Sequence, residues 1–313
     1  MSIIRAAVVQ CGSHLFDNLR TLEALAKTAA SAAGNGAKIA VYPEAYVGGY
    51  PKGLDFGARV GMRSSEGRKV FQRYFDAAIA VPGPETEWIG SLARAYGLVL
   101  VVGVIEREGG TLYCTVLFFG DDGALLGKRR KLMPTALERL VWGFGDGSTL
   151  AAVDTAAGRV GGVICWENFM PALRMSQYAQ GVQFYCAPTV DDRDSWVPAM
   201  RMIAMEGRCF VLSACQHFTR AQAPGDVSPI QGDDPETVLI RGGSLVVDPM
   251  GDVIAGPVYD EDTILFADLD TDLIARGKYD LDTVGHYARP DIFSLQINTA
   301  PQRPVTFGTR NQA

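Results

Sequence analysis

The residue best suited to do chemistry is Cys165, which ends a strand-like run in Arg159-Val-Gly-Gly-Val-Ile-Cys-Trp-Glu-Asn-Phe. The residues before it are small or β-branched, as in a buried strand, and Pro171 soon afterwards favours the start of a helix. A thiol at the end of a strand is held rigidly beside backbone N–H groups that can bind an anion. Cys165 is therefore either a nucleophile or a small apolar residue that closes a strand.

Two other strand-like runs also end in a functional group. One is Ala37-Lys-Ile-Ala-Val-Tyr-Pro-Glu44, which precedes a glycine-rich loop, and the other is Ala124-Leu-Leu-Gly-Lys-Arg-Arg-Lys131, which precedes Leu-Met-Pro-Thr-Ala-Leu-Glu138. In open α/β sheets, ligands bind outside the carboxyl ends of the strands. We therefore expect a carboxylate, an ammonium and a thiol to meet in one site.

The chemistry of this trio depends on a base for the thiol. Histidine is the usual partner, but His14, His217 and His286 all lie outside strand-end loops of this kind, which disfavours a Cys–His pair. A carboxylate can replace histidine if burial raises its pKa, and Glu44 is the candidate. Lys131 would supply fixed positive charge that stabilises charge developing on the substrate.

Each of these residues has a structural alternative. Glu44 could cap a loop. Lys131 ends the basic run Lys128-Arg-Arg-Lys, and we expect Lys128 to Arg130 to form a solvated face, as such runs usually do. Glu138 has capping-box spacing in Thr135-Ala-Leu-Glu, so it could simply bond back to Thr135 at the start of a helix.

Longer motifs around these residues resemble one known family. They are Tyr42-Pro-Glu-Ala-Tyr, Gly48-Gly-Tyr-Pro-Lys-Gly, Arg130-Lys-Leu-Met-Pro-Thr-Ala-Leu-Glu-Arg, Trp142-Gly-Phe-Gly-Asp-Gly-Ser, Cys165-Trp-Glu-Asn, Tyr185-Cys-Ala-Pro-Thr, Glu206-Gly-Arg-Cys-Phe-Val and Gly285-His-Tyr-Ala-Arg-Pro-Asp. In order and nearly throughout its length, the chain resembles the nitrilase branch of the carbon–nitrogen hydrolase superfamily, and it looks closest to plant-type nitrilases and their bacterial counterparts.

The resemblance implies a role for each candidate residue. Cys165 would be the nucleophile, Glu44 the general base, Lys131 the cationic stabiliser and Glu138 a second glutamate that positions the reactants. Trp166-Glu167 favours nitrilases over the amidase and carbamoylase branches. Many nitrilases have histidine where this chain has Arg129, a departure that we do not expect to affect catalysis.

The implied activity is hydrolysis of an organic nitrile to a carboxylic acid and ammonia through a thioimidate and an acyl-enzyme, with some amide product and with no metal or organic cofactor. Two alternatives stay open: an amidase or carbamoylase of the same fold, and a non-catalytic assembly subunit, which the complete set of four residues disfavours. The substrate could be an aliphatic nitrile, an arylalkyl nitrile or a cyano-amino acid.

Aromatic residues in loops near the proposed catalytic groups could line an apolar pocket for the substrate, although each could equally pack the loops. They are Tyr46, Tyr50, Trp142, Trp166, Phe169 and Trp196.

Composition restricts the partners and the cellular compartment that we expect for the chain. The 313 residues have 48% hydrophobic and 20% charged content, and the net charge of −6 argues against nucleic acid as the main partner. No apolar run approaches the ~18–20 residues of a membrane helix, and the N-terminal residues read as a first strand rather than a signal peptide. The six cysteines show no zinc or CxxC spacing, which favours a cytoplasmic, disulfide-free protein.

The elements that must position the site alternate along the chain, which predicts an α/β fold. The resemblance specifies a four-layer αββα sandwich, as one domain over residues 1–287, with a tail (288–313) that packs on the domain or on a neighbouring subunit of a dimer or larger spiral. Gly109-Gly110 predicts a hairpin turn. We predict strands near 3–10, 37–43, 98–106, 111–119, 124–131, 160–165, 182–187, 209–215, 243–248 and 263–268, and helices over 18–33, 85–96, 171–180 and 198–206.

Overall fold

The computed structural model describes residues 3–305 and contains two large β-sheets. The first sheet has the strand order β15-β1-β2-β5-β6-β7, in which β1, β2 and β5 are parallel neighbours and the other pairs are antiparallel. Its strands are β1 (Ile3–Gln10), β2 (Ile39–Val41), β5 (Val99–Glu108), β6 (Thr111–Phe119), β7 (Leu125–Arg130) and β15 (Thr263–Asp270).

The second sheet has the order β12-β13-β11-β10-β9-β8, with β14 also paired to β13. Here β9, β10 and β11 are the parallel neighbours, so each sheet has a parallel centre and antiparallel edges. Its strands are β8 (Val153–Thr155), β9 (Gly158–Gly162), β10 (Phe184–Cys186), β11 (Phe210–Ser213), β12 (His217–Thr219), β13 (Val238–Val247) and β14 (Val253–Tyr259), while β3 (Ala58–Arg59) and β4 (Met62–Arg63) form a separate small hairpin.

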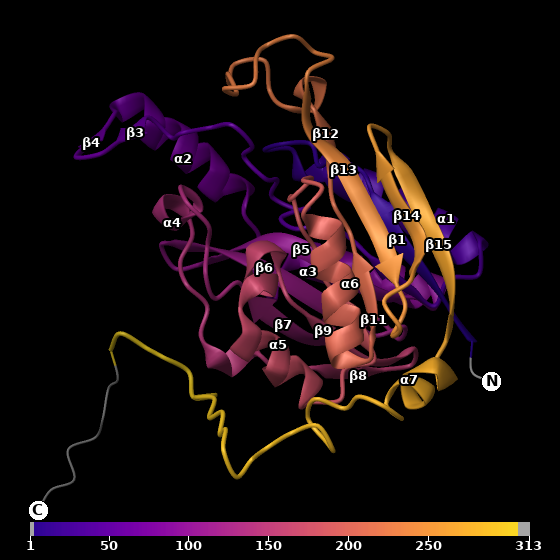
Figure 1. Ribbon diagram of the computed structural model, residues 1–313. Coiled ribbons are helices and arrows are strands. Elements are labelled where there is room, and N and C mark those ends of the chain that lie inside the picture. The colour runs from indigo at the N-terminus through magenta and orange to yellow at the C-terminus, as the bar shows by residue number, and fades with distance from the viewer. Residues whose placement is uncertain (1–2, 306–313) are drawn as a thin grey trace, which may run out of the picture.

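Three apolar clusters fill the spaces between four layers (Figure 1). Helices α1 (Asn18–Gly34) and α3 (Pro84–Tyr96) pack on the outer face of the first sheet, and α5 (Pro171–Tyr178) and α6 (Trp196–Gly207) pack on the outer face of the second. The third cluster lies between the two sheets. The predicted αββα sandwich is confirmed.

Strand β1 shows why the central strands read as continuous apolar runs. Ala6 and Val8 belong to the cluster between the sheets, whereas Ala7 and Val9 belong to the cluster under the helices. Successive side chains of a strand point to opposite faces, and both faces of this sheet are covered. The run from Ala6 to Val9 is therefore apolar on both faces.

The predicted strands and helices are present, with shifted ends, and Gly109 and Gly110 join β5 to β6 as predicted. Helix α6 begins at Trp196 rather than Pro198. Several elements lacked a clear sequence signal: α2 (Ser65–Ala77), α4 (Glu138–Val141), α7 (Asp272–Gly277), the strands β3, β4, β8, β12 and β14, and the 3₁₀ turns η1 (Gly147–Thr149), η2 (Cys165–Phe169) and η3 (Arg220–Gln222).

Residues 288–305 form no helix or strand and are largely exposed. This segment meets the body of the molecule at residues 146–147, where the Gln302 N–H donates to Asp146 Oδ2 at 2.7 Å and Gly147 packs closely against the Asn298 carbonyl oxygen. Residues 306–313 of the predicted tail lie outside the described part of the chain. Between residues 3 and 305, no helix has the length and apolar character needed to cross a membrane.

Candidate active site

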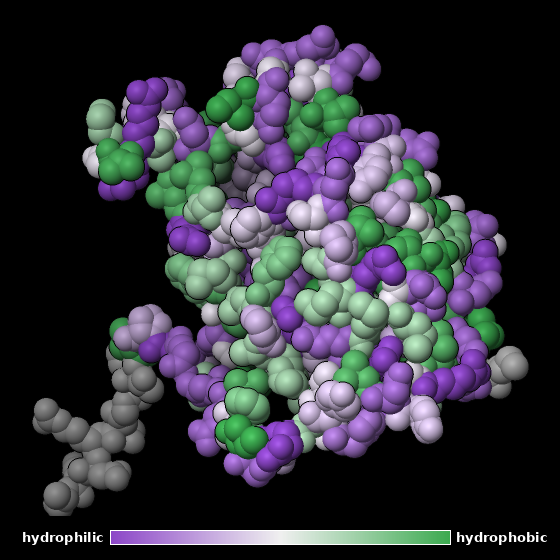
Figure 2. Space-filling model, in the orientation of Figure 1, coloured by the Kyte–Doolittle hydropathy of each residue, from purple (hydrophilic) through white to green (hydrophobic). Residues whose placement is uncertain are grey.

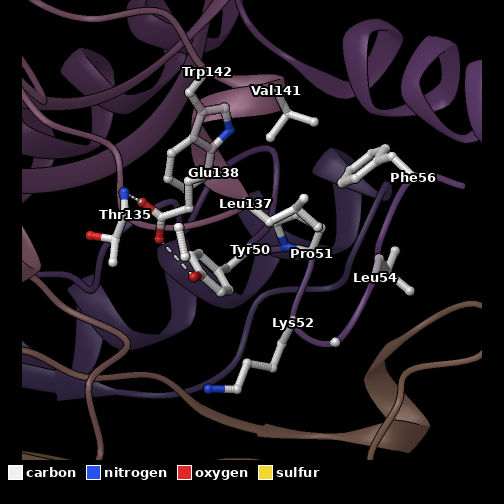
Figure 3. A pocket seen from close by; sticks show the side chains of 12 residues that line it. Tyr50, Pro51, Lys52, Leu54, Phe56, Thr135, Leu137, Glu138, Val141 and Trp142 are labelled. Atoms are coloured by element: carbon white, nitrogen blue, oxygen red, sulfur yellow. Dashed lines mark hydrogen bonds between the residues drawn. The ribbon is translucent and has the colours of Figure 1, made fainter. Parts of the chain in front are cut away.

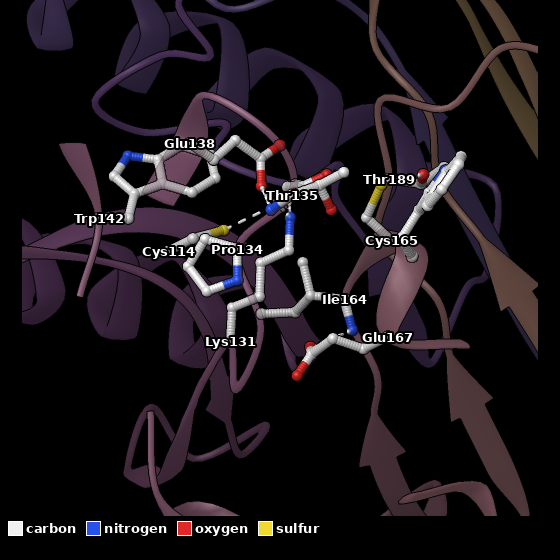
Figure 4. Close-up of polar contacts among 12 residues, drawn as sticks. Cys114, Lys131, Pro134, Thr135, Glu138, Trp142, Ile164, Cys165, Glu167 and Thr189 are labelled. Carbon is white, nitrogen blue, oxygen red and sulfur yellow. Dashed lines mark hydrogen bonds and ion pairs between the residues drawn. The ribbon is translucent and has the colours of Figure 1, made fainter. Parts of the chain in front are cut away.

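Three strand ends bring the predicted residues together (Figure 4). Glu44 follows β2, Lys131 follows β7, and Cys165 follows β9, so the first sheet supplies the charged groups and the second supplies the thiol. All three are buried, with 1%, 0% and 4% of their surface exposed. The αββα arrangement thus brings the ends of strands from both sheets together.

Lys131 lies between two carboxylates. Its Nζ is 2.6 Å from Glu44 Oε1 and 2.8 Å from Glu138 Oε2, and the Tyr50 hydroxyl donates to Glu138 Oε1 at 2.7 Å. Burial alone would lower the pKa of Lys131, but the surrounding acidic groups, led by Glu44, outweigh it and raise that pKa well above 10.5. Lys131 therefore stays cationic although its side chain is buried.

Glu138 makes both of the contacts that the sequence left as alternatives. The Thr135 N–H donates to Glu138 Oε2 at 2.6 Å, as capping-box spacing predicts, and the same oxygen binds Lys131. The turn at the start of α4 therefore fixes the carboxylate against the lysine.

Glu44 has the features of a general base. Burial raises its pKa above the ordinary 4.5, although Lys131 and, to a smaller extent, the Cys165 thiol oppose the shift. Oxygen Oε1 accepts from Lys131 and, at 3.6 Å, from the Cys114 thiol. Oxygen Oε2 is buried and accepts no hydrogen bond from any described residue. Oε2 is thus the oxygen free to take a proton.

Cys165 is the first residue of the turn η2, and its φ of +51° is rare for a residue other than glycine. Strand β9 ends at Gly162, earlier than predicted, although the Cys165 N–H still donates to Pro188 O at 2.9 Å. Thr189 Oγ1 donates to Sγ at 3.2 Å. Burial, and then the negative charge of Glu44, raise the pKa of this thiol, so it is protonated at rest and needs a base.

Cys165 opens onto a pocket of about 220 Å³. An adjoining hollow shares Tyr50, Lys52, Thr135 and Glu138 with it but does not reach the thiol (Figure 3). Most of the residues that line the pocket are polar or charged. It is lined by Tyr50, Lys52, Thr135, Glu138, Cys165, Trp166, Val190, Asp191, Asp192 and Arg193.

Residues 5–279 match the carbon–nitrogen hydrolase family. The chain belongs to this family. It is 55% identical to an aliphatic nitrilase of Sinorhizobium fredii, over 97% of this chain and 99% of the relative. It is 50% identical to the bifunctional nitrilase/nitrile hydratase NIT4A of Lupinus angustifolius, over 97% and 88%. The predicted relation to the nitrilase branch, with plant and bacterial relatives, is confirmed.

The fold matches a carbon–nitrogen hydrolase from Helicobacter pylori with a TM-score of 0.73 at 18% identity, over 93% of this chain and 97% of the other.

Some of the aromatic residues predicted to line this hydrolase's pocket lie on its wall, and others lie beside it or in the core. Tyr50 and Trp166 lie on the wall beside Cys165. Trp142 lines only the adjoining hollow, where its ring lies 5.3 Å from Lys131 Nζ and contacts Tyr50 edge-on. Phe169 is 47% exposed and packs edge-on against Trp166.

Trp196 and Tyr46 lie in the hydrophobic core rather than on the pocket wall. Because α6 starts at Trp196, the indole faces the second sheet and its Nε1–H donates to Ser213 Oγ at 2.9 Å. Tyr46 packs under the helices of the first sheet and its hydroxyl contacts Cys11 Sγ at 3.1 Å. Neither ring can contact a substrate in this arrangement.

The prediction of a solvated basic run was wrong. Arg129 is 1% exposed and forms a bidentate ion pair with Glu167, at 2.9 and 3.0 Å. Lys128 and Arg130, on the opposite face of β7, bind the buried carboxylate of Glu106. The acidic partners are 22 to 38 residues away in sequence, so the run itself gave no signal of them.

All six cysteines are free thiols, as predicted from their spacing. Within residues 3–305, no group of three His, Cys, Asp or Glu side chains is arranged to bind a metal ion.

Proposed function

We propose that this carbon–nitrogen hydrolase is a nitrilase, which converts an organic nitrile and two waters into a carboxylic acid and ammonia. The observation that carries the proposal is the buried group formed by Cys165, Glu44, Lys131 and Glu138 at the end of a small pocket. Relatives about half identical over nearly the whole chain, named as nitrilases, support it.

The first step forms a covalent bond to Cys165. Glu44 Oε2 takes the thiol proton as Sγ adds to the nitrile carbon, and one π pair of the C≡N bond moves to nitrogen. The nitrogen then takes this proton from Glu44, which gives a thioimidate and leaves Glu44 ionised for the next step. Lys131 stabilises the negative charge that develops during the addition, an effect whose removal typically costs roughly 10²–10³ in turnover.

Water then adds to the thioimidate carbon with Glu44 as base. In the resulting tetrahedral intermediate, the C–N bond breaks, the protonated nitrogen leaves as ammonia, and a thioester remains on Cys165. A second water cleaves the thioester, releases the acid and returns the thiol. Glu138, bound to both Lys131 and Tyr50, orients these groups.

The same intermediate can instead lose the thiolate. Breaking the C–S bond releases an amide and regenerates Cys165 after one water rather than two. We propose a minor amide product on this ground. A relative named as both nitrilase and nitrile hydratase supports it.

The test measures ammonia, acid and amide from aliphatic, arylalkyl and cyano-amino acid nitriles and from the matching amides. We compare the wild-type protein with Cys165→Ala and with Cys186→Ala, a buried cysteine of the core. Release of ammonia from a nitrile by the wild type and Cys186→Ala, but not by Cys165→Ala, is expected. Turnover of amides alone would identify an amidase, and unchanged turnover in Cys165→Ala would exclude the thiol mechanism.

We further propose that the chain self-associates and is cytoplasmic. Large apolar side chains are exposed on the projecting β3–β4 hairpin and along the C-terminal segment, including Val60, Met62 and Phe293 (Figure 2). Six unpaired cysteines suit a reducing compartment. Light scattering on the purified protein tests the first point, because a monomer at micromolar concentration would contradict it.

A further inference from the structure

Glu167 lies directly behind the active site, where it joins the two sheets. Its carboxylate accepts the backbone N–H of Leu132 at 2.6 Å and that of Ile164 at 3.3 Å. Leu132 is the residue after Lys131, and Ile164 is the residue before Cys165. One carboxylate therefore holds backbone neighbours of both the cation and the nucleophile.

Arg129 fixes the carboxylate in turn. The guanidinium meets both oxygens of Glu167, and both side chains are about 1% exposed. A bidentate pair has a defined geometry as well as a favourable energy. Because Arg129 lies on β7 and Glu167 on η2, the pair couples the strand that ends at Lys131 to the turn that begins at Cys165.

The turn that Glu167 holds needs such support. Cys165 has a left-handed φ of +51°, a conformation that costs free energy for any residue with a Cβ. It persists only where surrounding contacts determine it. Glu167 supplies one of these contacts by accepting the Ile164 N–H across the turn.

We propose that Arg129 and Glu167 are positioning residues for nitrile hydrolysis, which set the location of Cys165 Sγ relative to Lys131 and so determine how the tetrahedral intermediate divides between acid and amide. The inference rests on the proposed nitrilase function. Loss of ammonia requires an acid placed at the departing nitrogen, whereas loss of the thiolate requires none. A displaced thiol therefore favours C–S cleavage and amide release.

The test uses three changes and a matched control. Glu167→Gln keeps the shape of the side chain, Arg129→Lys keeps the charge but not the bidentate geometry, and the double variant Arg129→Met/Glu167→Gln leaves no charge unpaired. The control is Glu106→Gln, which disrupts the other buried ion pair of β7 on the face that does not contact the nucleophile turn.

The readouts are the amide fraction of the product, kcat and the thermal midpoint. The amide fraction does not depend on how much protein is folded, so a loss of stability alone cannot change it. We expect each of the three changes to raise the amide fraction and to lower kcat by about tenfold to a hundredfold, as displacements near 1 Å do. We expect Glu106→Gln to lose thermal stability and to keep the wild-type amide fraction.

The double variant is decisive if a single variant fails to fold, because removing both charges avoids an unpaired buried charge. A double variant that regains the thermal midpoint but keeps the altered amide fraction supports positioning. Wild-type amide fraction and kcat in the folded double variant would overturn the inference. A wild-type protein that forms neither acid nor amide would overturn the proposed function and this inference with it.

Discussion

The loop after β2, which positions Glu44, and the turn after β9, which positions Cys165, solve the same problem in different ways. Each follows a central strand of its sheet, and each contains a residue other than glycine in the left-handed region, Ala45 at φ +50° and Cys165 at φ +51°. Both conformations are costly. The contacts that maintain them differ.

The base loop is held mainly by close backbone packing. A Cβ on Gly103 of the neighbouring strand β5 would overlap the carbonyl oxygen of Pro43 and lie 2.9 Å from Glu44 Cα. Side-chain hydrogen bonds add to this: Gln216 Nε2 donates to the Glu44 carbonyl at 2.8 Å, and further along the loop Asn18 Oδ1 accepts the Gly48 N–H at 3.0 Å. The position of the base therefore depends on the absence of a side chain next to it.

The nucleophile turn is held mainly by polar side chains. Asn168 Nδ2 donates to the carbonyls of Val163 and Cys165, at 2.9 and 2.7 Å, and Asn168 Oδ1 accepts from the Tyr185 hydroxyl at 2.9 Å. Glu167 binds the turn from the other side. Close packing against Gly103 is thus the main constraint on the Glu44 loop, whereas side-chain hydrogen bonds are the main constraint on the Cys165 turn. The two loops should therefore respond to different substitutions.

The largest effect is expected for Gly103→Ala. The added methyl must push the Glu44 loop away, and such overpacking costs ~1–3 kcal/mol as well as displacing the base. We expect a lower thermal midpoint and near-complete loss of nitrile turnover. Gly110→Ala, at the end of the same hairpin, is the control, because its Cβ would meet nothing within 4 Å. Full activity in Gly103→Ala would show that packing does not position the base.

A smaller effect is expected for Asn168→Ala. It leaves the two turn carbonyls without their donor, at ~1–3 kcal/mol of unfolding free energy, and we expect kcat to fall by about a hundredfold because the thiol moves. The control is Gln177→Ala, a buried amide of α5 that binds Leu150 O away from the turn. Equal losses of kcat per folded molecule in both variants would contradict a specific role for Asn168.

The local pattern predicted the α/β alternation and the three strand-end residues, whereas the four layers and the role of Glu138 came from the resemblance to a known family. Apolar strands covered on both faces give continuous runs, and Glu44, Lys131 and Cys165 each lie next to the strand that positions them. The spacing of Glu138 to Thr135 predicted only the contact with the Thr135 N–H, and the structure shows this contact together with the bond to Lys131.

The features that the sequence did not predict depend mostly on contacts between residues far apart in the chain. Arg129 lies on β7 of the first sheet and Glu167 in the turn after β9 of the second, so the sequence around Arg129 gave no sign of this buried partner. Trp196 appeared to be a loop residue because Pro198 suggested a later helix start. Short or partly exposed elements such as β12, β14 and α2 lacked a strong periodic pattern of apolar residues in the sequence.

The pH dependence of turnover tests the assignment of Glu44 as the general base. Glu44 must be ionised to accept the thiol proton, and burial raises its pKa above 4.5. Activity should therefore fall by about tenfold per pH unit below that raised pKa, at higher pH than an exposed glutamate would give. Lys131 should cause no loss below pH 10.5, because its acidic neighbours raise its pKa. A kcat/KM profile that is flat down to pH 4.5 would contradict the assignment of Glu44.

The smallest effects separate two tryptophans near the nucleophile turn. Trp166, on the pocket wall, donates to Asp191 and packs under Arg193, so Trp166→Phe should change KM across the nitrile panel with a small change in stability. Trp196→Phe should lower the unfolding free energy by about 1 kcal/mol through loss of the bond to Ser213, with KM unchanged. A changed KM in Trp196→Phe, with KM unchanged in Trp166→Phe, would show that Trp196 and not Trp166 contacts the substrate.

The central claim is that Cys165 becomes covalently bonded to the substrate carbon. We would mix the protein with a nitrile that it turns over, quench in acid within one turnover, and measure the masses of the cysteine-containing peptides. We expect a thioimidate or acyl adduct on the Cys165 peptide alone, absent from Cys165→Ala. An adduct on another cysteine, or ammonia released by Cys165→Ala at the wild-type rate, would contradict it.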